Sequence, residues 1–129
     1  MSSLLPYISF PGTCKEALQY YAQIFNAEIT CMTTFGESPI PVDEQDRNRI
    51  YNAELVADLV HFKASDDLPR YPVKVGSNIS LFVAFNDMGL RQEVFEKLAK
   101  GGKVLFPLDE VFGMLRDKYD IQWMLAATH

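Results

Sequence analysis

The predicted order of secondary-structure elements occurs twice along this chain, and this repetition limits the fold more than any other feature. Each half reads as a strand, a helix and three further strands. Phe10 corresponds to Phe85 and Ala27-Glu28-Ile29 to Gly102-Lys103-Val104, in both cases 75 residues apart. Residue identity between the halves is low, so the repeat is one of fold. The sequence predicts an α+β fold made of two βαβββ modules, about 1–66 and 77–129, in one domain.

In the first half, residue spacing predicts one helix and four strands. A capping-box signal at Thr13 and Glu16 begins a helix that runs to about Phe25, with an apolar stripe facing the core. Residues 36–48 contain prolines and several charges and are typical of a long surface loop. The predicted strands are Leu5–Phe10, Glu28–Thr34, Arg49–Ala57 and Leu59–Ser65, followed by a connector from Asp66 to Gly76.

The second half follows the same order. Asn86-Asp87 begins a helix and Gly101-Gly102 ends it. The predicted strands are Asn78–Phe85, Lys103–Leu108, Phe112–Arg116 and Ile121–Ala127. In the last of these, we expect Trp123 to pack in the core, and residues 117–120 only to turn the chain.

Composition limits the function classes. The chain has 129 residues and 48% apolar content, enough for one continuous core. Its 17 acidic and 12 basic residues give a net charge of −5 without a basic cluster, which argues against a nucleic-acid partner. The sequence shows no leader and no apolar run of membrane-spanning length, so we expect a cytoplasmic protein without a membrane partner. Cys14 and Cys31 lack the spacing of a zinc or redox motif.

Several short segments together resemble one family. They are Pro6-Tyr7-Ile8-Ser9-Phe10, Glu16–Tyr21, Phe35-Gly36-Glu37-Ser38-Pro39, Ala53-Glu54-Leu55, Ala64-Ser65-Asp66, Ser77–Leu81 and Phe112-Gly113-Met114 through Trp123-Met124-Leu125. With the repeated modules, they resemble the PhnB-like branch of the vicinal oxygen chelate superfamily, which includes glyoxalases, dioxygenases and bleomycin-resistance proteins. The resemblance implies a curled mixed sheet that forms a cup, with two helices on its outer face. In enzymes of this group, the cup holds a divalent metal that acts as a Lewis acid.

The branch is often labelled as a 3-demethylubiquinone methyltransferase. This chain has no Gly-rich strand-to-helix turn of the kind that a nucleotide-like methyl donor usually needs. We therefore do not expect methyl transfer.

The metal ligands of the superfamily are poorly matched in this chain. The resemblance places them near Tyr7, His61, Asn78 and Met124, of which only His61 is a good ligand for zinc, nickel or iron. PhnB-like relatives often carry histidine at the positions of Asn52 and sometimes Gln122. We therefore expect neither a metal nor another cofactor.

Strand parity separates two faces of the predicted sheets, because successive side chains point to opposite sides. The face under the helices should hold Ile8, Phe10, Ala53, Leu55, Ile79, Leu81, Val83, Trp123 and Leu125. The other face should hold Tyr7, Ser9, Asn52, Glu54, His61, Lys63, Asn78, Ser80, Gln122 and Met124. This polar face either lines the cup or is simply solvated, as one face of many antiparallel sheets is.

The polar face supplies the candidate site residues. Glu54 and His61 are the acid/base candidates. The ligand-binding candidates are Tyr7, Ser9, Asn52, Asn78, Gln122 and Met124. The acidic pairs Asp66-Asp67 and Asp109-Glu110, and the run from Asp43 to Asp46, are interpreted as solvated caps and loops.

Three functions are compatible with this pattern. The first is a bleomycin-resistance-type protein that binds a small molecule without chemistry. The second is an enzyme that uses Glu54 and His61, either with a metal or by acid/base chemistry alone. The third is a structural dimer with a vestigial cavity. The resemblance also implies a homodimer, because sheets of the superfamily are open along one edge and commonly complete their cups by pairing modules, within one chain or across two. Exposed strand edges are otherwise a liability.

Overall fold

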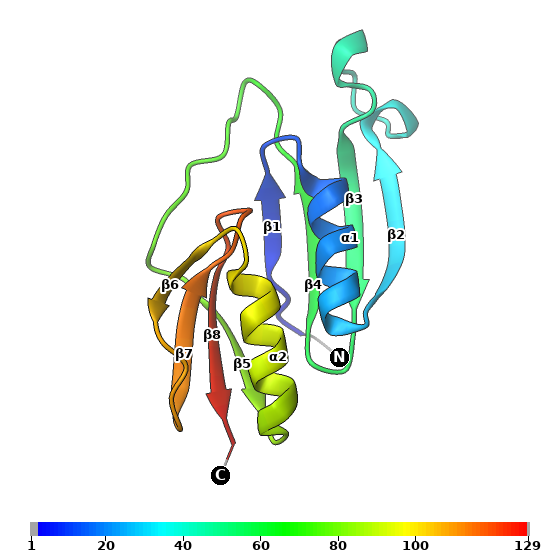
Figure 1. Cartoon of the computed structure of the whole chain (residues 1–129). Helices are drawn as coiled ribbons and strands as arrows, with labels where there is room; N and C mark the ends of the chain where they lie inside the picture. The colour runs from blue at the N-terminus through cyan, green and yellow to red at the C-terminus, as the bar shows by residue number, and fades with distance from the viewer. Residues whose placement is uncertain (1–2, 129) are drawn as a thin grey trace. The chain divides into compact units, whose positions relative to one another are not determined.

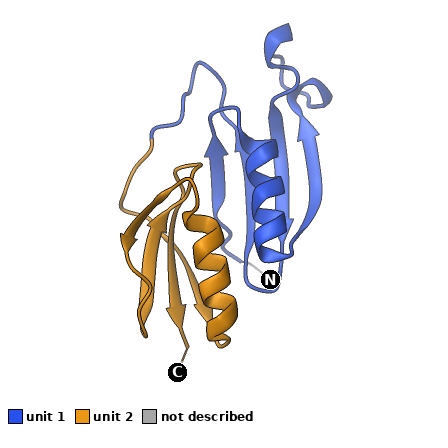
Figure 2. Cartoon of the chain, viewed as in Figure 1, with its two compact units in different colours: residues 1–74 blue, residues 75–129 orange. Residues whose placement is uncertain are grey.

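The computed structural model describes residues 3–128 and divides the chain into two compact units. The first unit covers residues 1–74 and the second covers residues 75–129 (Figure 2). The boundary falls inside the connector predicted from Asp66 to Gly76.

The first unit is a βαβββ module (Figure 1). Its sheet has the order β1-β4-β3-β2, in which β1 pairs with β4 in parallel and the other pairs are antiparallel. The predicted loop between β2 and β3 contains two short 3-10 helices, Phe35–Glu37 and Glu44–Asp46. The elements are β1 (Tyr7–Phe10), α1 (Cys14–Phe25), β2 (Glu28–Thr34), β3 (Ile50–Val56) and β4 (His61–Asp66).

The second unit repeats this arrangement. Its sheet has the order β5-β8-β7-β6, again with one parallel pair, β5 with β8. The elements are β5 (Leu81–Phe85), α2 (Met88–Ala99), β6 (Lys103–Phe106), β7 (Phe112–Arg116) and β8 (Gln122–Ala127). The predicted α+β class and the two βαβββ modules are therefore confirmed. Neither helix is long and apolar enough to cross a membrane, within the part of the chain that the structure describes.

The core of each unit lies between its helix and one face of its sheet. In the first unit, Leu18 and Tyr21 of α1 are buried together with Leu55 and Phe62 of the sheet. The ring of Tyr21 meets that of Phe62 edge-on, with 5.9 Å between centroids. In the second unit, Trp123 is completely buried. The sequence prediction that Trp123 packs in the core is confirmed.

The start of α1 differs from the sequence prediction. The side chain of Thr13 makes no capping hydrogen bond, so the predicted capping box is wrong. Instead, the N–H of Cys14 donates to Oδ1 of Asp66 at 2.8 Å, and Oδ2 of Asp66 accepts from the N–H of Ile50 at 2.8 Å. Asp66 is only 6% exposed, so its interpretation as a solvated residue is also wrong. Asp46, in the predicted acidic surface run, is buried as well.

The turn between β7 and β8 also has a structural role that the sequence did not indicate. Asp117 is 2% exposed, and its Oδ1 accepts from the N–H groups of Tyr119 and Ile121. Its Oδ2 accepts from Nε1 of Trp123 at 2.8 Å. The prediction that residues 117–120 only turn the chain is therefore wrong, because Asp117 ties the turn to the largest core side chain.

Strand β5 is shorter than predicted. It begins at Leu81, so Asn78 and Ile79 lie before the strand. Ile79 was assigned to the face under the helix but is 75% exposed. The apolar alternation of the sequence thus continues beyond the strand itself.

Equivalent backbone hydrogen bonds show which residues of the two modules correspond. At one end of each sheet, Phe10 O accepts from the N–H of Asp67 and Phe85 O accepts from the N–H of Thr128, both at 2.8 Å. Asp66 therefore corresponds to Ala127. At the other end, the N–H of Ala57 donates to Val60 O and the N–H of Asp117 donates to Ile121 O. The correspondences there are Ala57 with Asp117, Phe62 with Trp123, Glu54 with Met114 and His61 with Gln122.

Candidate functional site

The polar face of the first sheet lies opposite α1. Ala53, Leu55, Phe62 and Ala64 are buried on the helix side. Their strand neighbours therefore point to the opposite side. Those neighbours include three of the predicted site residues, Asn52, Glu54 and His61. Tyr7 and Ser9 lie on the same side, because they pair in register with Lys63 and Ser65, the neighbours of Ala64 on β4. All five are exposed or half-buried, as expected for a face that is not packed in the core of this unit.

Glu54 is the centre of a hydrogen-bonded cluster on this face. Its Oε2 lies 2.9 Å from Nε2 of His61, and its Oε1 accepts from Oγ1 of Thr30 at 2.5 Å. Lys63 is the direct cross-strand neighbour of Glu54 on β4. The hydrogen bonds from His61 and then Thr30, together with the positive charges of His61 and Lys63, lower the pKa of Glu54. Glu54 is therefore an anion at neutral pH.

Thr30 was missed by the sequence reasoning. The pairing of β2 with β3 shifts register between Ile29 and Cys31, which leaves Thr30 as an extra residue in the strand. Bulges of this kind redirect a side chain and are frequent beside functional sites. Continuing the pairing of Glu28 with Val56 and of Ile29 with Leu55 by one residue also places Thr30 opposite Glu54, so the register of β2 with β3 is the signal that could have found this residue.

His61 stands at the start of β4 with 43% of its side chain exposed. Glu54 is its hydrogen-bond partner among residues 3–128. A carboxylate on one ring nitrogen fixes the orientation of an imidazole and leaves the other nitrogen for proton exchange. The pair thus has the arrangement of a general acid/base.

Two further predicted residues flank this cluster. Nδ2 of Asn52 donates to Sγ of Cys31 at 3.8 Å, and the hydroxyl of Tyr7 lies 3.5 Å from Tyr51 O. Both contacts are long, and Tyr7 is 55% exposed. The side chains of Tyr7 and Asn52 are therefore held only weakly.

The other three predicted site residues belong to the second unit. Asn78 is exposed and lies before β5, while Met124 is half-buried on β8. Gln122 is 7% exposed and is already bonded within its unit. Its Nε2 donates to Oγ of Ser80 at 2.7 Å and its Oε1 accepts from Nη2 of Arg116 at 2.9 Å. Gln122 thus links β7 to the segment that precedes β5.

The donor atoms do not fit the divalent metal of the superfamily. Residues 3–128 contain no group of three or more His, Cys, Asp or Glu side chains that could hold a metal ion. Glu54 and His61 provide two such side chains, and their donor atoms face each other. A catalytic zinc site normally needs three protein ligands.

The helix starts also differ from those that bind nucleotide-like cofactors. The first N–H of α1 donates to Asp66, and Oδ1 of Asp87 accepts from the N–H of Leu90 at the start of α2. Cofactor phosphates and similar anions use free N–H groups at such positions. In this chain, side-chain carboxylates occupy both helix starts.

The fold places the chain in a class. Two βαβββ modules, each with one helix on a four-stranded mixed sheet, are the ground plan of the vicinal oxygen chelate superfamily. Residues 2–126 match the family model described as 3-demethylubiquinone-9 3-methyltransferase, and the chain belongs to this PhnB-like family.

Three relatives cover nearly the whole chain. The crystal structure of PA1353 from Pseudomonas aeruginosa is 31% identical, covers 98% of both chains and superposes with a TM-score of 0.89. A PhnB protein from Bacillus cereus, described as a putative 3-demethylubiquinone-9 3-methyltransferase, is 24% identical to this chain. The match covers 98% of this chain and 100% of the other, with a TM-score of 0.79. Protein YjdN from Escherichia coli (strain K12) is 26% identical over 95% of this chain and 92% of its own.

Proposed function

We propose that the polar face of the first sheet binds a small organic molecule without the divalent metal that is usual in the superfamily. The observation that supports this proposal is the cluster of Glu54, His61 and Thr30, which comes from three strands and stays partly exposed. An ionised carboxylate accepts hydrogen bonds only, whereas Tyr7 and Asn52 at its edge can also donate. A ligand with adjacent hydroxyl and carbonyl groups would match this combination.

A specific observation favours a second candidate function, metal-free acid/base catalysis. Glu54 Oε2 and His61 Nε2 lie 2.9 Å apart, a distance at which a carboxylate can orient an imidazole base. In this reading the free ring nitrogen of His61 removes a proton from the bound molecule. Glu54 stabilises the resulting imidazolium and does not itself transfer a proton.

The metal-free part of the proposal is tested by calorimetric titration with Zn²⁺, Ni²⁺, Mn²⁺ and Fe²⁺. We expect no stoichiometric binding at micromolar metal concentrations. Stoichiometric uptake that disappears in His61→Ala would contradict the proposal. Uptake that persists in His61→Ala would place the metal elsewhere and leave the polar face unaffected.

The binding site itself is tested with a library of small diols, hydroxyketones and hydroxy acids, followed by amide NMR spectra. Saturable shifts in β3 and β4 are expected for at least one compound class, and Glu54→Gln should abolish them. Glu28→Gln is a matched control, because it removes the same charge from an exposed position on β2. Shifts that survive Glu54→Gln would move the site away from this cluster.

Turnover separates the two candidate functions. A compound that binds and returns unchanged after prolonged incubation supports simple binding. A compound that is converted by the wild type but only bound by His61→Gln supports catalysis.

We also propose a homodimer. Each sheet, considered by itself, has two edge strands: β1 and β2 in the first unit, and β5 and β6 in the second. Exposed edges favour pairing with another strand. Sedimentation that finds only monomer at high concentration would remove this part of the proposal. A cytoplasmic location and the lack of nucleic-acid or membrane partners remain predictions from composition.

A further inference from the structure

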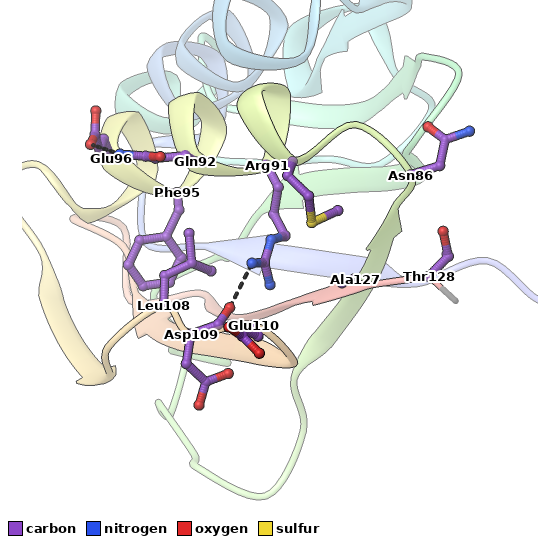
Figure 3. Close-up of a pocket in the computed structure, with 11 residues that line it drawn as sticks. Asn86, Arg91, Gln92, Phe95, Glu96, Leu108, Asp109, Glu110, Ala127 and Thr128 are labelled. Carbon is purple, nitrogen blue, oxygen red and sulfur yellow. Dashed lines mark hydrogen bonds between the residues drawn. The ribbon is translucent and has the colours of Figure 1, made fainter.

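A cavity in the second unit lies beside the first turns of α2, near the end of β8 and the loop that precedes β7 (Figure 3). Its volume is about 870 Å³, which is within the usual range for small-molecule sites. None of the residues that line it belongs to the polar face described above. The lining residues that bear on its chemistry are Met88, Arg91, Phe95, Leu108, Glu110 and Ala127.

Arg91 is the unusual residue of this cavity. It extends from α2 toward the loop, where its Nη2 donates to Asp109 O at 2.6 Å (Figure 3). The residue is only 5% exposed, and its Nε and Nη1 have no hydrogen-bond partner. No ion pair of Arg91 is present among residues 3–128. A buried cation with most of its donors unused is strongly unfavourable unless an anion compensates it.

Asp109, whose backbone carbonyl bonds to the guanidinium, has its carboxylate engaged elsewhere. Its Oδ1 accepts from the N–H groups of Val111 and Phe112 at 2.8 and 2.9 Å. These two bonds, followed by the charge of Arg91, lower the pKa of Asp109. The carboxylate is therefore ionised, yet it caps the loop and makes no hydrogen bond to the guanidinium.

In the first unit, an aspartate fills the corresponding corner, by which we mean the place where the start of the helix meets the end of the last strand of the module. There, the Asp66 carboxylate lies between the first N–H of α1 and the N–H of Ile50. By the pairing registers, the counterparts of Ile50 and Asp66 are Glu110 and Ala127, and Met88 begins α2 as Cys14 begins α1. Met88, Glu110 and Ala127 all line the cavity. The first module thus has the carboxylate of Asp66 at this position. The second module has the methyl group of Ala127 there, beside a cavity and the unpaired Arg91.

From this correspondence we infer that the cavity of the second unit binds the carboxylate of a small organic acid at Arg91. The ligand carboxylate takes the role that Asp66 has in the first unit, and the apolar body of the acid packs against Phe95 and Leu108. Glu96, Asp109 and Glu110 also line the cavity, so their charges disfavour phosphate and other multiply charged anions. A monocarboxylate is the class that satisfies both conditions.

The test uses the whole protein with sodium benzoate as the probe and benzyl alcohol as its uncharged analogue, at constant ionic strength. Amide NMR titration should show saturable shifts for Ala127, Thr128 and the first turn of α2 with benzoate. Benzyl alcohol and inorganic phosphate should bind at least roughly tenfold more weakly. Benzyl alcohol has no charge to offer Arg91, and phosphate is repelled by the acidic residues of the lining.

Two variants remove the anion site in opposite ways. Arg91→Met deletes the charge, and Ala127→Asp supplies the carboxylate that the first module has at this position. Both should lose the benzoate response. Both should melt at the same temperature as the wild type or higher, since Arg91→Met removes the uncompensated charge and Ala127→Asp compensates it. Arg70→Met, at an exposed position of the first unit, is the matched control and should bind benzoate normally.

Two outcomes would overturn the inference. Benzoate shifts that persist in Arg91→Met would show that the guanidinium is not the recognition group. A wild type that shows no shift with benzoate or other monocarboxylates would exclude a free acid as the ligand. If the wild type showed no shift and Arg91→Met also changed the oligomeric state, the arginine would instead face a second copy of the chain.

Discussion

The two modules share one topology but place their buried carboxylates at opposite ends. The first module has Asp66 where the second has Ala127, and the second has Asp117 where the first has Ala57. Asp66 joins the helix start to the sheet, whereas Asp117 joins the last hairpin to the indole of Trp123. The two modules therefore share the apolar pattern that packs helix against sheet. They differ in the buried carboxylates that hold the ends of the strands in place. The cavity lies at Ala127, where the second module has no carboxylate.

The largest expected effect comes from Trp123→Ala. The side chain is fully buried, so its removal should cost about 3–5 kcal/mol in the free energy of unfolding, measured in urea. Trp123→Phe makes the second module like the first, where Phe62 occupies this position. It should cost about 1–2 kcal/mol, because Asp117 loses one buried donor. Equal costs for the two variants would show that the hydrogen bond, and not packing, dominates.

Asp66→Ala should have the next largest effect. It makes the first module like the second at this corner and leaves the N–H groups of Cys14 and Ile50 without their acceptor. We expect a loss of about 2–4 kcal/mol in urea unfolding. Asp58→Ala, in the exposed turn of the same module, is the control and should change stability by less than about 0.5 kcal/mol. A loss as small as that of the control would mean that water replaces Asp66 without penalty.

The thiol of Cys14 gives a smaller, pH-dependent effect at the same corner. Burial first, and then the charge of Asp66, raise the pKa of Cys14 from 9.0 to about 12. The unfolded chain therefore loses the thiol proton near pH 9 while the folded chain keeps it. This contribution is fully present below pH 9 and is lost as the pH rises toward 12.

At pH 10 the loss should be about 1.4 kcal/mol, seen as a difference between unfolding curves at pH 8 and pH 10. Cys14→Ala should lack this part of the pH dependence. An identical slope in the wild type and the variant would contradict the raised pKa.

The smallest effect concerns Glu54 and His61, whose counterparts in the second module are Met114 and Gln122. The pKa of Glu54 is lowered more by the hydrogen bond from His61 than by that from Thr30. Carboxyl NMR titration should therefore find a larger rise of the Glu54 pKa in His61→Ala than in Thr30→Val. The reverse order would mean that the bulge residue, and not the histidine, holds this carboxylate.

The apolar pattern was sufficient to predict the layers of this protein but not its polar contacts. Strands β2 and β7 have the bounds that were predicted from alternation, and both modules have the predicted order of elements. Alternation of apolar and polar residues indicates which side of a strand is apolar, and it can be recognised from neighbouring positions in the sequence alone. It failed at Asn78 and Ile79, where the alternating pattern continues outside the strand.

The buried carboxylates were missed for a different reason. An aspartate at the end of a predicted strand looks the same whether it faces water or the start of a helix far away in the sequence. Asp66 bonds to Cys14 across 52 positions, so only the three-dimensional structure reveals its partner. Arg91 was missed similarly, because a single arginine near a helix start normally lies on the surface.

The bond between Cys14 and Asp66 has a consequence for hydrogen exchange in the first module. Amides in the first turn of a helix usually exchange quickly, since they have no partner within the helix and the ends fray. The amide of Cys14 is buried and donates to a residue at the end of β4. Its deuterium uptake should therefore be slow and should match that of the central amides of β4, because the proton is released only when the strand and the helix separate.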